Sequence, residues 1–290
     1  MFLPFLPLCY GLSMPLRSEV RRWMRKSHDD SWPEHFRWLA RFYRWRRRAF
    51  LEGVDRAVPA DVTAIILVYG RPQNAETLVH LLLRTPSVQR VVLSNNNRLI
   101  HIRDWLTIQD PRLVIIDQPV DRSCPYRHEI ARRYESPFYL LVDDDLFLAP
   151  SQLEWVLGAL RKDTSRVHGV QGQLFDPGTD AFLHNIRNRE TPVDVVNRLY
   201  AFTRVHLREF FRLVDLLRFG PGSREWYQSM WDDMVLSFSG NTRPLVHEVG
   251  TFIDCPLSSD PTIAVWRQQG FFDFRVSLFH RLTALKSLSP

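Results

Sequence analysis

Residues 138–145 read FYLLVDDD, an apolar run that is followed at once by three carboxylates. A short continuous apolar run rich in aromatic and branched residues is typical of a strand covered on both faces, as in a parallel sheet. Residues 64–69 read AIILVY and form a second run of this kind, which ends in the polar turn Gly70-Arg71-Pro72. The chain therefore contains two predicted buried strands, each followed by polar side chains.

Helical and strand-like segments alternate around these two runs. The pattern predicts helices over residues 75–84 and 125–134, and further strands over residues 88–93 and 113–116. Because strands separated by helices form parallel sheets, we expect an α/β fold with a doubly wound, mainly parallel sheet flanked by helices. Ligands of such sheets bind beyond the carboxyl ends of the strands. The polar residues expected at that edge are 69–71, 95–97 and 143–145.

The second half of the chain is mixed. We predict helices over residues 151–161, within 193–219 and over 231–239, a strand over 167–174, and partly helical structure after residue 265. With 290 residues, 45% of them hydrophobic, the chain can bury one large core or two small ones. We divide it into an N-terminal arm (1–60) and two halves of an α/β unit (61–150 and 151–290).

Charge is concentrated in the arm. Residues 1–60 hold 12 Lys and Arg against 6 Asp and Glu, whereas the other 230 residues hold 26 of each. Nucleic-acid binding needs basic residues spread over a folded face, so we expect no nucleic-acid partner. The three cysteines, Cys9, Cys124 and Cys255, are too few and too scattered for a disulfide framework or a CxxC metal site.

The arm is predicted to contain a helix from Trp32 to about residue 50, with Phe36, Leu39, Ala40 and Tyr43 on one stripe. Two interpretations stay open. The helix packs on the main domain with its arginines in water, or its arginines and interleaved aromatic residues lie on an anionic membrane surface. Residues 1–16 lack the basic start of a secretory signal, so a cleaved signal is not expected.

The three carboxylates at 143–145 are the sharpest chemical feature. Alternate side chains at a strand end can face one cavity, where a divalent ion such as Mn²⁺ or Mg²⁺ relieves their repulsion; the plain alternative is a solvated acidic turn. Asp232 and Asp233 form a second acidic pair, which suits either a helix start or catalysis. Arginines that could bind phosphate are Arg71, Arg122, Arg127 and Arg275. The histidines His247 and His280 could complete a metal shell, although a lone histidine is usually structural.

Taken together, these segments resemble GT-A glycosyltransferases, and more closely the exostosin-like retaining transferases of family sixty-four. The chain has Val-Tyr-Gly-Arg (68–71) where that family has Thr-Tyr-Asn-Arg, and Leu-Val-Asp-Asp-Asp (141–145) at its DXD motif. It differs at Gly70, which replaces an Asn, and at Ser94, which replaces a Trp. The other similar segments, which extend the resemblance over about residues 62–285, are 91–96, Arg127, 168–170, 231–234 and 266–282.

The resemblance implies a GT-A fold and a metal-dependent transferase that uses a nucleotide-diphospho-sugar, such as a UDP-sugar, and a carbohydrate or lipid-linked acceptor, with retention. It makes 61–150 the nucleotide-sugar half and 151–290 the acceptor and catalytic half. The resemblance implies that Asp145, with Asp143, ligates Mn²⁺ or Mg²⁺ and that Asp144 binds the donor sugar. Asp233, with Asp232 as its neighbour, would act at the anomeric carbon. Arg275 would stabilise the leaving diphosphate. The residues implied to hold the nucleotide are Tyr69, Arg71, Asn95, Asn96 and Arg127.

Two other functions stay open at this point. An inverting family-two transferase would use Asp233 as a general base. The second alternative is a nucleotidyltransferase or a nucleotide-sugar binding module, although residues 70–73 lack the Gly-rich loop and Lys of nucleotidyltransferases. We expect a cytoplasmic protein, with contact to a membrane surface left open as one of the two interpretations of the arm; the alternative location is the Golgi or secretory lumen, where animal members of the family work.

Overall fold

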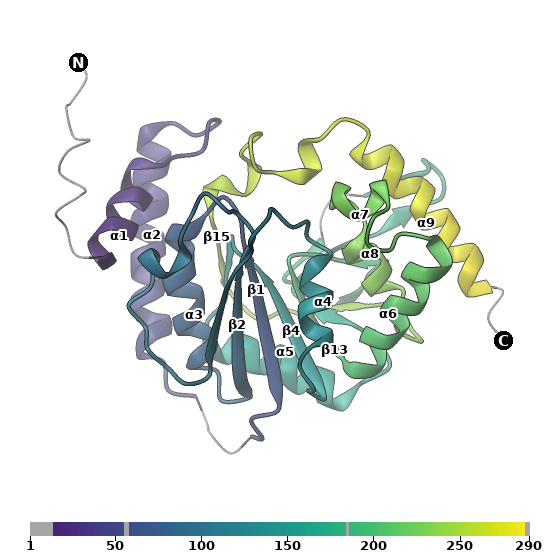
Figure 1. The fold of residues 1–290 in the computed structure, drawn as a ribbon, viewed down its shortest axis with the longest axis horizontal. Coiled ribbons are helices and arrows are strands. Elements are labelled where there is room, and N and C mark those ends of the chain that lie inside the picture. Colours follow the sequence, from purple (N-terminus) through teal and green to yellow (C-terminus); the bar gives the residue numbers. More distant parts are fainter. Residues whose placement is uncertain (1–13, 55–57, 184–185, 288–290) are drawn as a thin grey trace.

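The acidic run of residues 143–145 follows the middle of a large mixed sheet. In the computed structural model, which describes residues 14–54, 58–183 and 186–287, β4 (Phe138–Asp143) lies between β1 (Val62–Val68) and β13 (Leu199–Thr203) (Figure 1). The strand order is β11-β14-β6-β13-β4-β1-β2-β3. β1 pairs in parallel with β2 and β4, and β2 with β3, whereas β13 runs antiparallel to both of its neighbours. The predicted mainly parallel sheet is confirmed.

The other elements surround these strands. The remaining strands of the large sheet are β2 (Val88–Asn95), β3 (Leu113–Asp117), β6 (His168–Gly169), β11 (Thr191–Pro192) and β14 (Leu245–Val246). Short strands form smaller sheets: β5 (Leu146–Phe147) with β15 (Ile253–Asp254), β8 (Phe175–Asp176) with β9 (Ala181–Phe182), and β7 (Gln171–Gln173) with β10 (Ile186–Arg187) and β12 (Val195–Val196). The helices are α1 (Met14–Met24), α2 (Trp32–Leu51), α3 (Ala75–Leu83), α4 (Tyr126–Arg132), α5 (Pro150–Lys162), α6 (Arg204–Leu217), α7 (Arg224–Gln228), α8 (Asp232–Ser237) and α9 (Phe271–Ser287). Single 3₁₀ turns are η2 (Pro72–Asn74), η3 (Ile102–Trp105), η4 (Pro256–Ser259) and η5 (Val265–Arg267).

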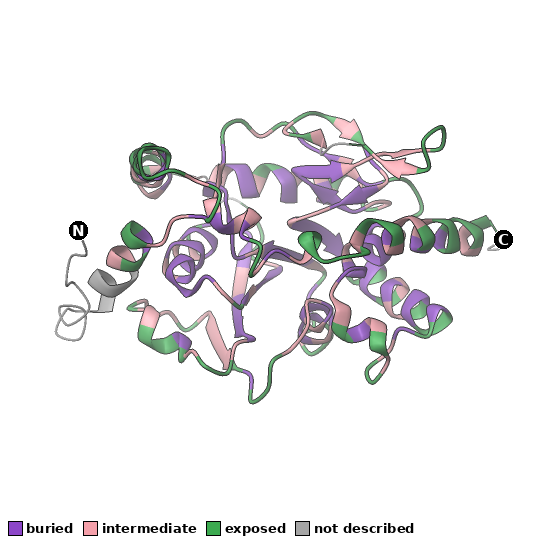
Figure 2. Cartoon of the chain, turned by 90° about the horizontal axis from the view of Figure 1, so that it is seen from above, coloured by how far each residue is buried: buried purple, intermediate pink, exposed green. Residues whose placement is uncertain are grey.

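Helices cover both faces of the sheet, which explains why its central strands are apolar throughout. Successive side chains of a strand point to opposite faces. On β4, Leu140 and Val142 belong to one core with α2, α3 and α5, whereas Tyr139 and Leu141 belong to a second core with α4, α6, α8 and α9. Figure 1 shows α2 and α3 on one side of the strands and α4, α6 and α9 on the other. Seen from above, the helices are buried on their inner faces and exposed on their outer ones (Figure 2).

The sheet brings the predicted polar edge together. Asn95 ends β2 and pairs with Val68 at the end of β1, while Asp143 ends β4 opposite Leu67. The strand predicted over residues 167–174 is wrong in extent, because the chain divides there into β6 and β7, which belong to different sheets. Gly169 lies so close to Val196 and to the Leu199 carbonyl that a Cβ would clash, so the chain needs a glycine where the division occurs.

The arm packs against the main domain, which is the first of the two interpretations given above. Ser31 and Glu34 form a capping box at the start of α2. The predicted apolar stripe is wrong in part: Leu39 is buried, but Phe36 and Ala40 are exposed, and the buried face is formed by His35, Trp38, Leu39, Phe42 and Ala49. Burying large aromatic side chains removes the most apolar surface from water, which favours this rotation of the helix.

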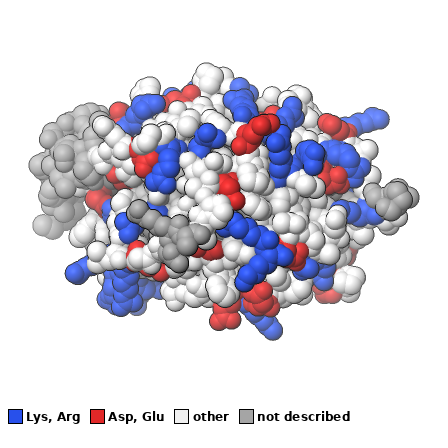
Figure 3. All heavy atoms as spheres, turned by 90° about the horizontal axis from the view of Figure 1, so that it is seen from below, with Lys and Arg blue, Asp and Glu red and all other residues white. Residues whose placement is uncertain are grey.

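The opposite face of α2 carries exposed arginines, namely Arg37, Arg41, Arg44, Arg47 and Arg48. Contact of this face with a membrane surface stays a prediction. Within the described residues, no helix combines the length and hydropathy that crossing a bilayer needs. The face of the molecule seen from below carries basic and acidic side chains interspersed, without a continuous basic patch (Figure 3). Cys9 and most of the stretch 1–16 lie outside the described residues.

Phe42 joins the arm to the core, because its ring is fully buried and lies 5.0 Å, between centroids, from that of Phe147. We expect Phe42→Ala to lower the free energy of unfolding by about 3–5 kcal/mol, through lost burial and the cavity it leaves. The matched control is Phe36→Ala on the exposed face, with an expected change within about 0.5 kcal/mol. Denaturant unfolding measures both, and equal effects would contradict the packing of α2.

Candidate functional site

A cavity of about 1110 Å³ opens beyond the carboxyl edge of the sheet. It is lined from both halves of the chain, because segments after β1, β2 and β4 meet the start of α8 and the C-terminal segment there. Of the site residues implied by the resemblance, ten line this cavity and Asn95 does not; the candidate phosphate-binding residue Arg122 lines it as well. The ten are Tyr69, Arg71, Asn96, Arg127, Asp143, Asp144, Asp145, Asp232, Asp233 and Arg275.

Asp144 fixes the turn that follows β1. Its Oδ1 accepts a hydrogen bond from Arg71 Nη1 at 2.5 Å, and its Oδ2 accepts one from the backbone N–H of Tyr69 at 3.3 Å. Asn74 donates to the Asp144 carbonyl at 2.8 Å, and Arg71 also donates to the carbonyl of Leu257. Burial raises the pKa of Asp144, against the lowering effect of the Arg71 guanidinium. Its main visible role is therefore to hold the turn, with both carboxylate oxygens occupied.

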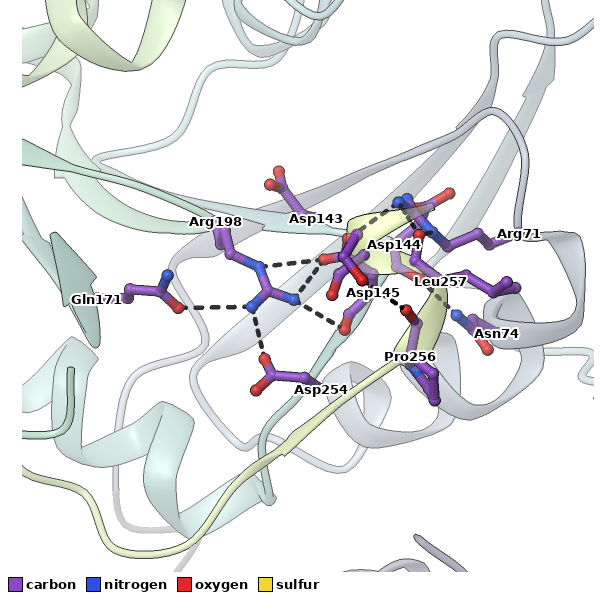
Figure 4. A network of polar contacts seen from close by, with 12 residues as sticks. Arg71, Asn74, Asp143, Asp144, Asp145, Gln171, Arg198, Asp254, Pro256 and Leu257 are labelled. Carbon is purple, nitrogen blue, oxygen red and sulfur yellow. Dashed lines mark hydrogen bonds and ion pairs between the residues drawn. The ribbon is translucent and has the colours of Figure 1, made fainter. Parts of the chain in front are cut away.

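Asp145 is held by two guanidinium groups, as Figure 4 shows. Arg198 Nη2 lies 2.7 Å from its Oδ1, and Arg71 Nη2 lies 3.2 Å from its Oδ2. Arg198 also pairs with Asp254 at 2.5 Å and contacts Gln171 at 3.5 Å. Burial by itself raises the pKa of Asp145, but the two arginines outweigh it, so that the pKa lies below its usual value. This carboxylate stays ionised at neutral pH.

Arg127 connects the first acidic cluster to the second. Its Nη1 lies 2.7 Å from Asp143 Oδ1, its Nε lies 2.8 Å from Asp232 Oδ2, and the guanidinium stacks over the ring of Tyr200. Burial raises the pKa of Asp143 to about 6, although Arg127 opposes this and the side chain keeps about a third of its surface exposed. Burial also acts on Asp232, but there Arg127 and His128 outweigh it and lower the pKa to about 2.

Asp233 stands at the start of α8, paired with the buried Arg275 at 2.7 Å. Arg275 also donates to the carbonyl of Met230 at 3.2 Å and to Gln173 Oε1 at 3.2 Å, so α9 is connected to the segment before α8 and to β7. The Asp233 carboxylate additionally caps the N–H of Met234. These contacts fix the orientation of the Asp233 side chain towards the cavity.

The two asparagines after β2 have different positions. Asn96 lines the cavity, and its side chain donates to the carbonyl of Arg122 at 3.1 Å. Asn95 instead donates to Asp117 and to the carbonyl of Ile100, which shapes the loop behind the cavity. A direct ligand contact of Asn95 therefore has no support in this arrangement. Tyr69, in contrast, leaves its ring about half exposed at the rim.

Residues of the cavity that were not identified from the sequence include Arg198, Asp254, Gln171 and Tyr200. Arg198 stands in a short turn between β12 and β13 with a left-handed backbone (φ 68°), and no local pattern marks it. Conversely, two histidines considered as ligands lie elsewhere. His247 pairs with His168 at 2.8 Å and Glu190 at 3.0 Å, and His280 pairs with Asp180.

The carboxylates of the cavity offer oxygen donors to a divalent ion. Oxygen donors of the kind that Mn²⁺ and Mg²⁺ prefer are present, and Asp143 is the acid of the run with a partly exposed carboxylate. Among the described residues, however, no three His, Cys, Asp or Glu side chains converge as a ready-made metal group. Asp143 and Asp145 suit a cation by chemistry, and an ion there would share their oxygens with the paired arginines.

Comparison with known proteins gives structural similarities only, since no family model and no curated protein matches the chain. GalNAc-T7 with UDP, GalNAc and Mn²⁺ is similar with a TM-score of 0.47 and 10% identity, over 67% of this chain and 43% of that one, so the chain spans less than half of its length. The mannosyltransferase PcManGT from Pyrobaculum calidifontis, in complex with GDP-Man and Mn²⁺, is similar with a TM-score of 0.43 and 11% identity, over 96% and 87%. CMP:2-keto-3-deoxy-manno-octonic acid synthetase complexed with CTP gives 0.42 and 14%, over 76% and 99%. Similarities at these scores give no information about the function of this chain.

Removing the connection between the acidic clusters tests the site's electrostatics. Arg127→Met leaves the Asp143 and Asp232 carboxylates without their shared cation in a buried setting, so we expect a loss of about 3–5 kcal/mol in the free energy of unfolding. Arg132→Met, on the exposed side of α4, is the matched control, with a change within about 0.5 kcal/mol. Chemical denaturation measures both variants; an unaffected Arg127→Met protein would mean that the buried pairs do not form.

Proposed function

We propose that the protein is a metal-dependent glycosyltransferase that moves a sugar from a nucleotide-diphospho-sugar, such as a UDP-sugar, to a glycan or lipid-linked acceptor with retention of configuration. The observation that carries this proposal is the cavity at the carboxyl edge of the sheet, where carboxylates and buried arginines alternate. Such a lining offers carboxylate ligands for a divalent ion and guanidinium groups that can bind a diphosphate in the same place. Membership in the exostosin-like family is part of the proposal and rests on the sequence resemblance alone.

The first half of the chain would bind the nucleotide. The half-exposed ring of Tyr69 suits stacking on a base at the rim, and Asn96 adds an amide nearby. Arg127 is held in place by Asp143 and Asp232, so it meets a ligand as a preorganised cation. Asp144 would act by holding Arg71 and the turn, and its predicted contact with the donor sugar remains part of the proposal.

Asp143 and Asp145 would hold the Mn²⁺ or Mg²⁺ ion. When bound, such an ion supplies positive charge that stabilises the diphosphate as it leaves. The chain's own contribution to the same task is Arg275, which is buried beside the cavity and would add charge stabilisation to the leaving group.

Asp233 would act at the anomeric carbon, and its neighbour Asp232 would keep Arg127 in position. Arg275 holds one oxygen of Asp233 at 2.7 Å, which fixes the direction of the carboxylate. A fixed carboxylate can stabilise an oxocarbenium-like transition state or orient the acceptor hydroxyl. An inverting enzyme would instead use Asp233 as general base; determination of the product anomer distinguishes the two.

Ligand binding tests the class of function. A panel of nucleotides and nucleotide-sugars, each with Mn²⁺ or with EDTA, should give one diphospho-sugar that raises the melting temperature by about 5 °C or more at a hundredfold excess over its dissociation constant. The shift should need Mn²⁺ and should disappear in Asp145→Ala, together with transfer. Absence of a shift with every nucleoside diphosphate, in either condition, would contradict the proposed function.

Steady-state kinetics tests the catalytic residue. With the donor found above, Asp233→Asn should lower kcat by about a hundredfold or more while the dissociation constant of the donor changes less than threefold, because the carboxylate acts mainly in the transition state. Asp180→Asn is the matched control: it removes an exposed carboxylate that pairs with His280, and kcat should stay unchanged. A donor-binding defect with normal kcat would assign Asp233 to substrate binding instead.

A further inference from the structure

Both oxygens of Asp145 are in contact with guanidinium groups. Arg198 Nη2 lies 2.7 Å from Oδ1 and Arg71 Nη2 lies 3.2 Å from Oδ2, and the Asp145 side chain is almost fully buried (Figure 4). A divalent ion that uses this carboxylate therefore competes with a guanidinium group that already contacts the same oxygen. Competition of this kind between two cations bears directly on how tightly the ion is bound.

The backbone holds Arg198 in place for this contact. Its N–H donates to Tyr200 Oη at 2.9 Å, and its carbonyl accepts from the N–H of Asp143, also at 2.9 Å. Arg198 is a non-glycine residue with a left-handed backbone (φ 68°), a strained conformation that persists only where the surroundings impose it. The turn thus places a guanidinium against the acidic run by means of several contacts.

Each of the two arginines also pairs with a second carboxylate. Arg198 Nη1 lies 2.5 Å from Asp254 Oδ1, and Arg71 Nη1 lies 2.5 Å from Asp144 Oδ1. Breaking a buried ion pair is strongly unfavourable when a charge is left without a partner. When Asp145 is released, each guanidinium group still has another carboxylate as its partner. Replacement of a guanidinium contact of Asp145 by a divalent ion is therefore far less costly than breaking an isolated ion pair.

The charge of the cavity lining supports the same conclusion. Seven aspartates and six arginines line it, a formal net charge of −1 (six minus seven) before any ligand binds: Asp121, Asp143, Asp144, Asp145, Asp232, Asp233 and Asp254 against Arg71, Arg122, Arg127, Arg187, Arg198 and Arg275. The resident guanidinium groups therefore compensate most of the negative charge that would attract a free divalent ion. Loss of Arg198 changes the balance to −2 and frees an oxygen at the same time.

We propose that Arg198 is the resident counter-cation of Asp145 and sets the affinity of the site for a divalent ion by competing for that carboxylate. When the ion binds, Arg198 stays on Asp254 at the cavity wall. This inference rests on the proposed function, since it takes Asp145 as a metal ligand. It makes Arg198 a positioning residue that acts through Asp145.

Direct Mn²⁺ titration, followed by electron paramagnetic resonance on the full chain without nucleotide, tests the proposal. Arg198→Met should bind Mn²⁺ more tightly than the wild type by roughly tenfold or more, since one oxygen of Asp145 is freed. Arg187→Met is the matched control: Arg187 also pairs with Asp254 but is more exposed and has no contact with Asp145, so we expect less than a threefold change. Asp254→Asn should weaken Mn²⁺ binding several-fold, because Arg198 then has only Asp145 as a carboxylate partner.

Arg198→Met and Asp254→Asn are expected to change the Mn²⁺ affinity in opposite directions. This distinguishes competition for Asp145 from a purely structural role of Arg198. If Arg198 only supported the fold, Arg198→Met and Asp254→Asn would both lower the melting temperature and neither would bind Mn²⁺ more tightly, which would overturn the proposal. Equal tightening in Arg198→Met and Arg187→Met would also overturn it, in favour of a general charge effect. Failure of the proposed function has a different signature, namely that the wild type binds no nucleoside diphosphate with or without Mn²⁺.

Discussion

Three adjacent carboxylates at the end of a buried strand repel one another and have lost much of their water, and the surrounding structure compensates for both costs. The compensation comes from guanidinium groups on three separate segments: Arg71 after β1, Arg127 on α4 and Arg198 before β13. Each of them pairs with an acid of the run and with a further acceptor, so none is a simple surface ion pair. Because buried charges are stable only when paired, this network constrains the backbone around the whole cavity.

The same network explains why the site is built from parts that are distant in sequence. Arg127 reaches Asp232, 105 positions away, and Arg198 reaches Asp145, 53 positions away. Antiparallel pairing of β13 with β4 makes the second contact possible, since it carries the turn of Arg198 alongside the end of β4. The cavity is therefore preorganised by the fold itself, which suits electrostatic stabilisation of charge that develops during a reaction.

The N-terminal arm belongs to this arrangement and is more than an appendage. Trp38 Nε1 donates to the carbonyl of Asp254 at 2.6 Å, directly behind the carboxylate that holds Arg198. Arg25 donates to the carbonyl of Gly70 at 2.6 Å, and Arg267 pairs with Asp29 at 2.5 Å. The arm thus braces the turn after β1 and the C-terminal segment from outside the cavity, while the exposed arginines of α2 remain available for another surface.

The sequence by itself determined the buried strands, their alternation with helices, and the polar residues at the carboxyl edge. Those features follow from local composition, because a strand covered on both faces must be apolar throughout and its end must be polar to meet a ligand or water. It also identified eleven residues of the cavity lining. Only the tertiary structure decided how they combine: that Asp144 holds the turn of Arg71, that Asn95 faces a loop, that the helix of the arm buries Trp38 and Phe42, and that Arg198 and Asp254 belong to the site. These outcomes depend on strand pairing and on ion pairs between distant segments, whose energies no local pattern of residues encodes.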